Sequence, residues 1–200
     1  MIFEFTHCTV SNKIGKVDQN STLAFFRPLR NMVPEEVLSL ADQFNGLKAI
    51  HYVGELGAKV QSPKVYQGEG NQENTDGVFR NWAPARWALR MNLEKEFPLD
   101  SEGRISVKRS GLYYIYAQVN YLDEHDVNAF QVFVNEDPYL LCTVMTHTRH
   151  STTKANTCFT SGVAFLEAED QILVRDLEPM RNSVIRPSHT FFGLVQLSSN

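Results

Sequence analysis

The chain has 200 residues, of which 42% are hydrophobic and 21% are charged, as expected for one folded domain with a substantial core plus an appendage. Its formal net charge of −4 argues against a dedicated nucleic-acid binder, which carries a basic surplus. No apolar run is long enough to span a bilayer, and the start lacks the apolar segment of a signal peptide. We therefore expect any export signal to lie outside this sequence, in a longer membrane-anchored precursor.

Residues 1–46 differ from the rest of the chain and are interpreted as a stalk or linker. The segment is mostly polar and poorly periodic. Within it, Pro34–Phe44 predicts a short helix, because proline suits the first helical position and the apolar residues share one face. Gly46 is suited to end that helix. The domain proper is expected to span residues 47–198.

Two short motifs in the stalk indicate processing. Asn20-Ser21-Thr22 is an N-glycosylation acceptor sequence, which predicts a glycan on Asn20 of a secreted protein. Arg27-Pro28-Leu29-Arg30 has the Arg-x-x-Arg form that proprotein convertases cut. Cleavage after Arg30 would release the domain from its stalk.

From Ala49 onward the sequence has the features of an all-β domain. Short runs rich in aromatic and β-branched residues are separated by turn residues, as at Asp100–Gly103 and Asn135–Pro138. The predicted strands are Ala49–Val53, Val78–Trp82, Trp87–Leu93, Arg104–Lys108, Leu112–Tyr121, Ala129–Asn135, Tyr139–Met145, Thr157–Leu166, Gln171–Asp176 and Thr190–Leu197. With no βαβ alternation, they indicate an antiparallel sandwich or jelly roll. The polar stretch Gly54–Gly77 is interpreted as a surface loop.

The predicted strand Leu112–Tyr121 has two faces, and neither is suited to water. One face carries Tyr113, Ile115, Ala117, Val119 and Tyr121, which suit a sandwich core. The other face carries Leu112, Tyr114, Tyr116, Gln118 and Asn120. Aromatic rings beside neutral polar groups, without charge, are typical of a protein–protein interface. Periodicity alone equally allows a large β core in which the tyrosine hydroxyls are hydrogen-bonded.

The last predicted strand repeats this pattern. Phe191, Gly193, Val195 and Leu197 lie on one side, and the alternate residues on the other side are equally free of charge. This strand too requires cover on both sides. Two such strands in one sandwich predict an obligate oligomer.

Four motifs, in order, resemble those of the tumour necrosis factor ligand family. Gly111–Val119 is similar to the third-strand signature of these ligands. Ser161–Leu166, Thr190–Leu197 and Ala49–Gly54 resemble the sixth, closing and opening strands, and the spacing agrees over about 150 residues. The turn Glu167–Asp170 lacks the glycine that many family members have there, which favours an invertebrate ligand over the common vertebrate cytokines.

The resemblance implies a jelly-roll protomer over residues 47–198 that assembles as a homotrimer. It places Tyr116, Phe159 and Phe191 on the three-fold axis. The implied trimer-interface residues are Tyr114, Tyr116, Gln118, Phe159, Phe191, Gly193, Val195 and Leu197. The implied partners are a second and third copy of the chain and the cysteine-rich ectodomains of tumour necrosis factor receptors, which bind in the grooves between protomers. The implied location is extracellular, either secreted or shed from a type II membrane precursor.

Three cysteines occur, at positions 8, 142 and 158. Cys142 and Cys158 lie on predicted strands at the base of one loop, and the resemblance implies a disulfide between them. Two buried thiols are the alternative. Cys8 is left over and is either free or paired with another chain.

Receptor contacts are expected from loop residues and not from the strands. Basic side chains before Cys158 and in the Leu177–His189 loop provide a rim for an acidic receptor. Tyr139 lies where the resemblance places an apolar receptor contact, although packing within the sandwich is an equal alternative. The predicted receptor-binding residues are Tyr139, His147, Arg149, His150, Lys154, Arg181 and Arg186.

The alternatives come from two other classes of protein. No nucleophile elbow or phosphate-binding glycine loop occurs, so we expect neither an enzyme nor a cofactor. The spacing of His147 and His150, with no carboxylate near, does not suit zinc. A cupin-like or lectin-like protein would show clustered His and Glu ligands on strands. A C1q-like trimeric recognition head shares the predicted fold and is the second candidate.

Overall fold

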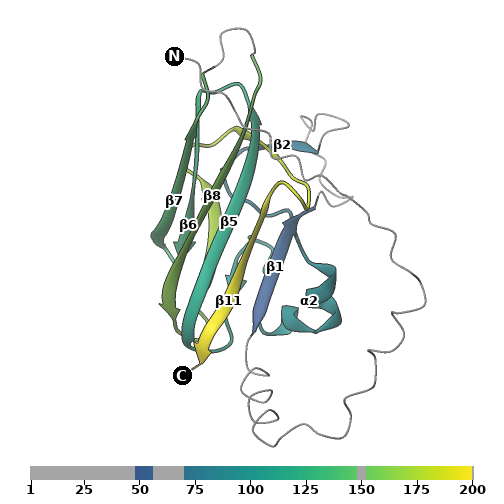
Figure 1. Ribbon diagram of the computed structural model, residues 1–200, viewed down its shortest axis with the longest axis vertical. Helices are drawn as coiled ribbons and strands as arrows, with labels where there is room; N and C mark the ends of the chain where they lie inside the picture. Colours follow the sequence, from purple (N-terminus) through teal and green to yellow (C-terminus); the bar gives the residue numbers. More distant parts are fainter. Residues whose placement is uncertain (1–47, 56–69, 148–151, 200) are drawn as a thin grey trace, which may run out of the picture. The chain divides into compact units, whose positions relative to one another are not determined.

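The computed structural model of the protein describes residues 48–55, 70–147 and 152–199, all within one compact unit, Phe44–Asn200. Its elements in chain order are β1 (Ala49–Gly54), β2 (Asn71–Asn74), β3 (Trp82–Pro84), the helix α2 (Arg86–Arg90), the 3₁₀ turn η1 (Leu93–Lys95), β4 (Ile105–Ser106), β5 (Gly111–Asp123), β6 (Val127–Val134), β7 (Asp137–Met145), β8 (Lys154–Leu166), β9 (Gln171–Asp176), β10 (Arg181–Val184) and β11 (Phe191–Ser199). The all-β class that the sequence predicts is confirmed (Figure 1).

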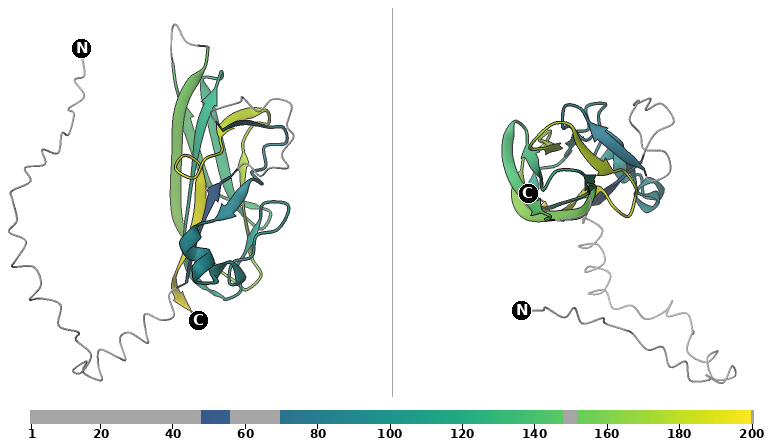
Figure 2. Two further views of the ribbon diagram at one scale, coloured as in Figure 1. Left: turned by 90° about the vertical axis from the view of Figure 1, so that its right-hand side faces the viewer. Right: turned by 90° about the horizontal axis from the view of Figure 1, so that it is seen from above.

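The strands form two antiparallel sheets. The front sheet has the order β2-β10-β5-β11-β1-β3, with β8 paired to the other side of β5. The back sheet has the order β4-β9-β6-β7. The views in Figure 2 show these layers enclosing the space between them. Most neighbours in the sheets are far apart in sequence, as in a jelly roll; β11, for example, returns to lie between β1 and β5.

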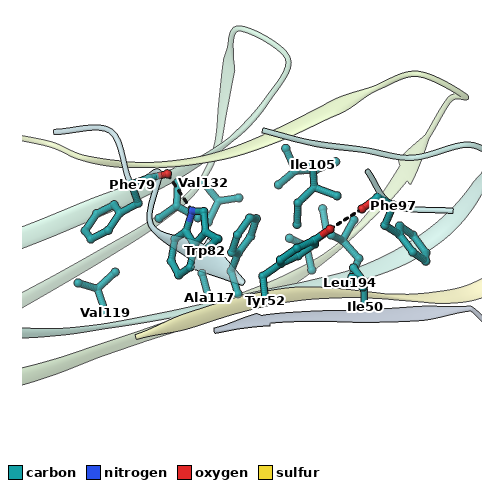
Figure 3. Packing of buried hydrophobic residues seen from close by; sticks show 14 of the residues in the cluster. Ile50, Tyr52, Phe79, Trp82, Phe97, Ile105, Ala117, Val119, Val132 and Leu194 are labelled. Atoms are coloured by element: carbon teal, nitrogen blue, oxygen red, sulfur yellow. Dashed lines mark hydrogen bonds between the residues drawn. The ribbon is translucent and has the colours of Figure 1, made fainter. Parts of the chain in front are cut away.

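The core lies between the two sheets. β5 alternates between buried and half-exposed residues along its length, and Tyr113, Ile115, Ala117 and Val119 are all buried. Burial of each large apolar side chain stabilises the fold by roughly 1.5–3 kcal/mol. Figure 3 shows how aromatic rings join this core with their polar atoms satisfied. The Tyr52 hydroxyl, for example, donates to a backbone carbonyl 2.8 Å away.

One end of the core holds a cluster of polar residues that we call the buried acid cluster: Asn74, Tyr121, Asp123, Asp176 and Ser183. The Tyr121 hydroxyl donates to Asp176 at 2.6 Å, and the Asn74 amide donates to the same carboxylate at 3.2 Å. Asp123 accepts hydrogen bonds from two backbone N–H groups, at 2.6 and 2.8 Å. Each buried carboxylate is therefore hydrogen-bonded, as burial requires.

One predicted strand is wrong. Trp87–Leu93 is not a strand, because Arg86–Arg90 forms α2 and Leu93 begins η1. The apolar residues at alternate positions resemble a strand, but arginine, alanine, leucine and methionine are good helix formers. Only Ala88 and Leu93 are buried, so this segment contributes two side chains to the core and exposes the rest.

Other differences concern short edge elements. β2 and β10 lie in segments that the sequence assigns to loops, and they pair with each other at the margin of the front sheet. The predicted strand Val78–Trp82 reduces to one bridge at Val78 and the first residue of β3. These pieces are polar or only a few residues long, so they show little alternation.

A disulfide joins the two sheets at one edge. Cys142 on β7 and Cys158 on β8 are bonded, with their Cα atoms 5.9 Å apart. This is the pairing that the resemblance implies. The disulfide closes a loop between the last strand of the back sheet and the outermost strand of the front sheet.

Candidate functional site

The outer face of the front sheet forms one surface without formal charge over β1, β11, β5 and β8. Register places its residues in rows, because residues that face each other in antiparallel strands share a side of the sheet. One row runs from Val53 on β1 through Phe191 and Gln118 to Phe159 on β8. We call this surface the uncharged face; it consists of Ala49, His51, Val53, Leu112, Tyr114, Tyr116, Gln118, Asn120, Leu122, Ala155, Thr157, Phe159, Ser161, Val163, Phe165, Phe191, Gly193, Val195 and Leu197.

Large apolar side chains on the uncharged face are open to solvent. Phe159 is 51% exposed, Val163 49% and Phe165 55%. The polar members are neutral and hydrogen-bonded: the Gln118 amide donates to the carbonyl of His189, and the Asn120 amide donates to Thr157. A contiguous apolar surface of this kind marks a site of association in a soluble protein.

Aromatic rings gather at the centre of the uncharged face. The Tyr116 hydroxyl lies 2.8 Å from Nδ1 of His51, in a hydrogen bond. The His51 ring centroid is 5.8 Å from that of Tyr116 and 5.1 Å from that of Phe191. Tyr114 stacks on Tyr116 with the ring centroids 5.9 Å apart. Contacts among these rings therefore position them already within the single protomer.

Burial shifts the proton affinities of this cluster. Burial, together with the neighbouring Tyr114, raises the pKa of the Tyr116 hydroxyl to about 12. Burial lowers the pKa of His51 below its usual value. Both residues are therefore neutral at physiological pH, and the centre of the face carries no charge.

Gly193 allows Tyr116 to lie flat on the sheet. A Cβ atom added at Gly193 would approach the Tyr116 Cζ atom to 2.6 Å and would also collide with the carbonyl oxygen of Ile50. The absence of a side chain at Gly193 therefore leaves room for the Tyr116 ring to pack against the backbone of β11. Removing a side chain from one strand so that an aromatic ring of the next can cover the backbone is a known cross-strand arrangement.

The edge where the two sheets meet presents a second apolar surface. We call it the β7–β8 edge and define it as the exposed β7 residues Tyr139 and Leu141, which lie outside the uncharged face. The Tyr139 hydroxyl donates to the carbonyl of Val163 at 2.6 Å, and this bond, like the disulfide, ties β7 to β8. Tyr139 is thus partly engaged within its own domain, while most of its ring stays accessible.

The predicted receptor-binding residues divide into two groups. Lys154 and His147 both face Asp126, at 2.5 and 3.5 Å, and Lys154 is largely covered. These residues lie at the Asp123 end of β5, since Lys154 pairs with Asp123. Arg181, on β10, lies toward that same end of β5, and Arg186 follows β10. Tyr139 lies near Val163, which is nine positions away along the strand, roughly 30 Å.

Several predicted positions lie outside the described residues. These are Cys8, Asn20, the Pro34–Phe44 helix, Arg30, Arg149 and His150. Across residues 48–55, 70–147 and 152–199, no group of three or more His, Cys, Asp or Glu side chains is arranged to hold a metal ion.

One exposed cluster was not predicted from the sequence. Trp87 and Leu89 lie on α2, beside β1 in Figure 1, together with Arg86 and Arg90, and the exposed Met91 follows the helix. Tryptophan, methionine and arginine are the residue types enriched at interface hot spots. The sequence did contain a signal for this cluster, an apolar run with two arginines and no acidic residue. The alternation of its apolar residues, however, predicted a strand.

Comparison with known sequences gives a consistent result. A profile of the TNF (Tumour Necrosis Factor) family matches residues 81–197. Ectodysplasin-A from Mus musculus and from Homo sapiens is 32% identical over 151 residues, a match that takes in 70% of this chain. The chain spans 37% of the length of these relatives. Within the described part of the chain, no helix is sufficiently long and apolar to cross a membrane.

Comparison with solved structures agrees on the fold. The structure of Eiger TNF from S. frugiperda superposes with a TM-score of 0.62 at 26% identity, and the match covers 77% of this chain and 94% of that one. Murine APRIL at pH 8.5 superposes with a TM-score of 0.51 at 20% identity, over 76% of this chain and 99% of the other. The second likeness concerns the fold alone.

Proposed function

The chain belongs to the tumour necrosis factor family, and we propose that it is the receptor-binding domain of an extracellular homotrimeric cytokine. In this proposal the trimer binds and clusters cysteine-rich receptors of the tumour necrosis factor receptor family. Clustering brings the intracellular parts of the receptors together and starts a signal. Family membership disfavours the C1q-like recognition head that the fold alone would allow.

The uncharged face is the observation that carries the proposal. It extends over four neighbouring strands and presents exposed phenylalanines in place of charged residues. A monomer with this surface would aggregate, whereas a trimer buries it. Obligate interfaces bury more than roughly 2,000 Å² and resemble a domain core that has been cut open. Tyr114, Tyr116, Gln118, Phe159, Phe191, Gly193, Val195 and Leu197 are the proposed contact residues.

A closed three-fold ring requires two different surfaces on each protomer, because its interfaces are heterologous. We assign the second surface to the β7–β8 edge, which lies at the opposite side of the front sheet from β1. Its exposed apolar residues suit the aromatic centre of a neighbour's uncharged face. The disulfide strengthens this edge, which would bear the contact in each of three interfaces.

Receptor contacts belong to the surfaces that the trimer leaves open. We retain the predicted set, His147, Arg149, His150, Lys154, Arg181 and Arg186, and keep Tyr139 in it as a residue of the β7–β8 edge that borders the groove between protomers. To this set we add Trp87 and Leu89 of α2 and the following Met91. Residues 1–46 serve as the stalk of a membrane-anchored precursor in this proposal. Cleavage after Arg30 would shed the domain, and Asn20 would carry a glycan.

The test of assembly is the molar mass in solution. Light scattering at low micromolar concentration is expected to give three times the protomer mass of 22.8 kDa for the wild type. Tyr116→Ala removes the ring that covers Gly193, and it is expected to give a folded monomer. Leu177→Ala, an exposed apolar residue beside the back sheet, is the control and keeps the trimer. A wild-type mass of one protomer contradicts the proposal.

The test of receptor binding is capture by a panel of cysteine-rich receptor ectodomains. Trp87→Ala removes an exposed ring whose helix buries only Ala88, so fold and mass are expected to persist. We expect at least one ectodomain to bind the wild type and Trp87→Ala to weaken that binding by ~30-fold, the effect of a hot-spot residue worth ~2 kcal/mol. Unchanged affinity would remove α2 from the receptor surface.

A further inference from the structure

His51 is distinctive among the residues of the uncharged face. In the described strands it is the member of that face whose ordinary pKa lies near neutrality, whereas the raised pKa of Tyr116 lies in the alkaline range. It lies in the middle of β1 and faces Gly193 on β11. A histidine in this place is the one group through which acid can put charge on the face.

The burial of the His51 ring favours its neutral form. Nδ1 is hydrogen-bonded to the Tyr116 hydroxyl at 2.8 Å, and the rings of Tyr116 and Phe191 flank the imidazole. Burial lowers the pKa of His51 already in the single protomer. Covering the ring with a second protomer removes more water and makes the imidazolium ion less stable still.

The elements packed around His51 offer its cation no carboxylate within the described residues. β11 contributes Phe191 and Gly193, and β5 contributes Tyr114 and Tyr116. β3, on the other side of β1, consists of a tryptophan, an alanine and a proline.

The charged groups nearby do not change this conclusion. α2, which contacts β1, carries Arg86 and Arg90, whose charge has the same sign as an imidazolium ion. Glu94 of η1 acts on Tyr52, whose side chain points to the opposite face of β1. Lys48, which precedes β1, is paired with Glu96 at 3.5 Å.

We propose that His51 makes the assembly sensitive to acid: protonation of its three copies weakens the trimer, while the protomers remain folded. This inference rests on the proposed trimer. Three identical sites give a steep response, because one histidine from each protomer takes up a proton as the ring opens. The disulfide and the core, which hold each protomer together, do not depend on the charge of this histidine.

The size of the effect follows from linkage. A group that binds its proton ten times less tightly in the trimer weakens assembly about tenfold once the pH lies below both of its pKa values. Because the trimer contains three copies of His51, the equilibrium constant for assembly is expected to fall by ~10³-fold. The loss is expected as the pH falls from about 7 to about 5, and assembly is restored when the pH rises again.

Sedimentation equilibrium of the full chain at about pH 8 and about pH 5, with circular dichroism at both values, tests the inference. The wild type is expected to be trimeric at pH 8 and largely monomeric but folded at pH 5. His51→Gln, which stays neutral and retains a polar group near Tyr116, is expected to remain trimeric at both. His147→Gln is the matched control, because His147 pairs with Asp126 away from the face, and it should follow the wild type.

The possible failures can be told apart. A wild type that is monomeric at pH 8 contradicts the proposed trimer and the inference with it. A trimer that persists unchanged at pH 5, or a His51→Gln variant that dissociates in acid as the wild type does, overturns the inference and leaves the trimer intact. Should His51→Gln fail to fold, or fold but form no trimer at pH 8, an NMR titration of the wild-type trimer decides: a His51 pKa at or above 6.5 overturns the inference.

Discussion

Asp176 gives the protomer a pH dependence that no surface residue can supply. Its side chain lies in the buried acid cluster, where burial raises its pKa to about 7 despite hydrogen bonds from Tyr121 and Asn74. The unfolded chain releases this proton at an ordinary pKa of 3.8. Between these values the native state binds more protons than the unfolded state, so the free energy of unfolding falls as the pH rises.

Asp176→Asn is therefore expected to gain stability relative to the wild type as the pH rises from about 5 to about 8. Asparagine keeps an acceptor for the Tyr121 hydroxyl but has no charge to bury. The difference is on the order of 3 kcal/mol at most. Urea denaturation at several pH values measures it. A gap between variant and wild type that does not change with pH counts against this account.

Asp123 supplies the matched contrast. Burial alone would raise its pKa, but hydrogen bonds from the backbone N–H groups of Asn182 and His125 outweigh burial and lower it. Its contribution is present above the unfolded pKa and is lost as the pH falls through the folded value. Asp123→Asn is accordingly expected to be most harmful at neutral pH, the opposite trend to Asp176→Asn.

Gly193→Ala tests the support beneath the aromatic centre. The added methyl group would collide with the Tyr116 ring and with the backbone of Ile50, and backbone cannot move aside. We expect a loss of roughly 1–3 kcal/mol in protomer stability, together with a weakened trimer. Thermal unfolding and light scattering measure the two effects.

Gly162→Ala on β8 is the control for that substitution. There the nearest atom is the end of the Leu140 side chain, at 2.8 Å, which can rotate away. A smaller effect than at Gly193 is expected. If both substitutions lower the stability of the protomer equally, the tight fit under Tyr116 is not the reason for glycine at position 193.

At the scale of elements, predictability followed the length of the alternating pattern. β5 and β9 appear close to where the sequence places them, because long runs with one buried face have a single register that hides the apolar side. α2 was predicted wrongly, because in so short a segment the spacing of three apolar residues fits strand and helix alike. β2 and β10 are polar and show little alternation. They are strands because they pair with each other in the folded protein, and not because of their sequence pattern.

The disulfide between β7 and β8 is expected to stabilise the protomer. Its two cysteines are 16 residues apart, and closing a loop of this size contributes about 3 kcal/mol in the chain-entropy model. The double substitution Cys142→Ser, Cys158→Ser should lower the free energy of unfolding by that amount. Chemical denaturation under non-reducing conditions measures it. Replacement of both cysteines, instead of one, adds no new unpaired thiol to the chain.

At the scale of the whole molecule, the sequence predicted one of the two proposed association surfaces. Alternation in β5 and β11 marked the outer residues, including Tyr116 and Phe191, as either core or interface, and the family resemblance favoured an interface. The part played by His51 was missed, since a single histidine in a strand has no pattern, and its neighbours come from β5 and β11. The β7–β8 edge required the two sheets to be placed together.

Two separate surfaces on each protomer lead to a test that a symmetric dimer would fail. Val195→Glu puts a charge in the middle of the uncharged face, beside Tyr114. Leu141→Glu puts a charge on the β7–β8 edge, where the side chain is already exposed. Each variant alone is expected to be monomeric, because every interface of its ring would bury one glutamate without a partner.

Mixing the two variants is expected to restore one interface. The intact face of Leu141→Glu can accept the intact edge of Val195→Glu, whereas a third protomer finds only damaged surfaces. The product is therefore a 1:1 complex with twice the protomer mass of 22.8 kDa. An isologous interface would place both damaged surfaces in every pair, and mixing would restore nothing. Light scattering of the mixture, with each variant alone as the reference, distinguishes a heterologous ring from a two-fold dimer.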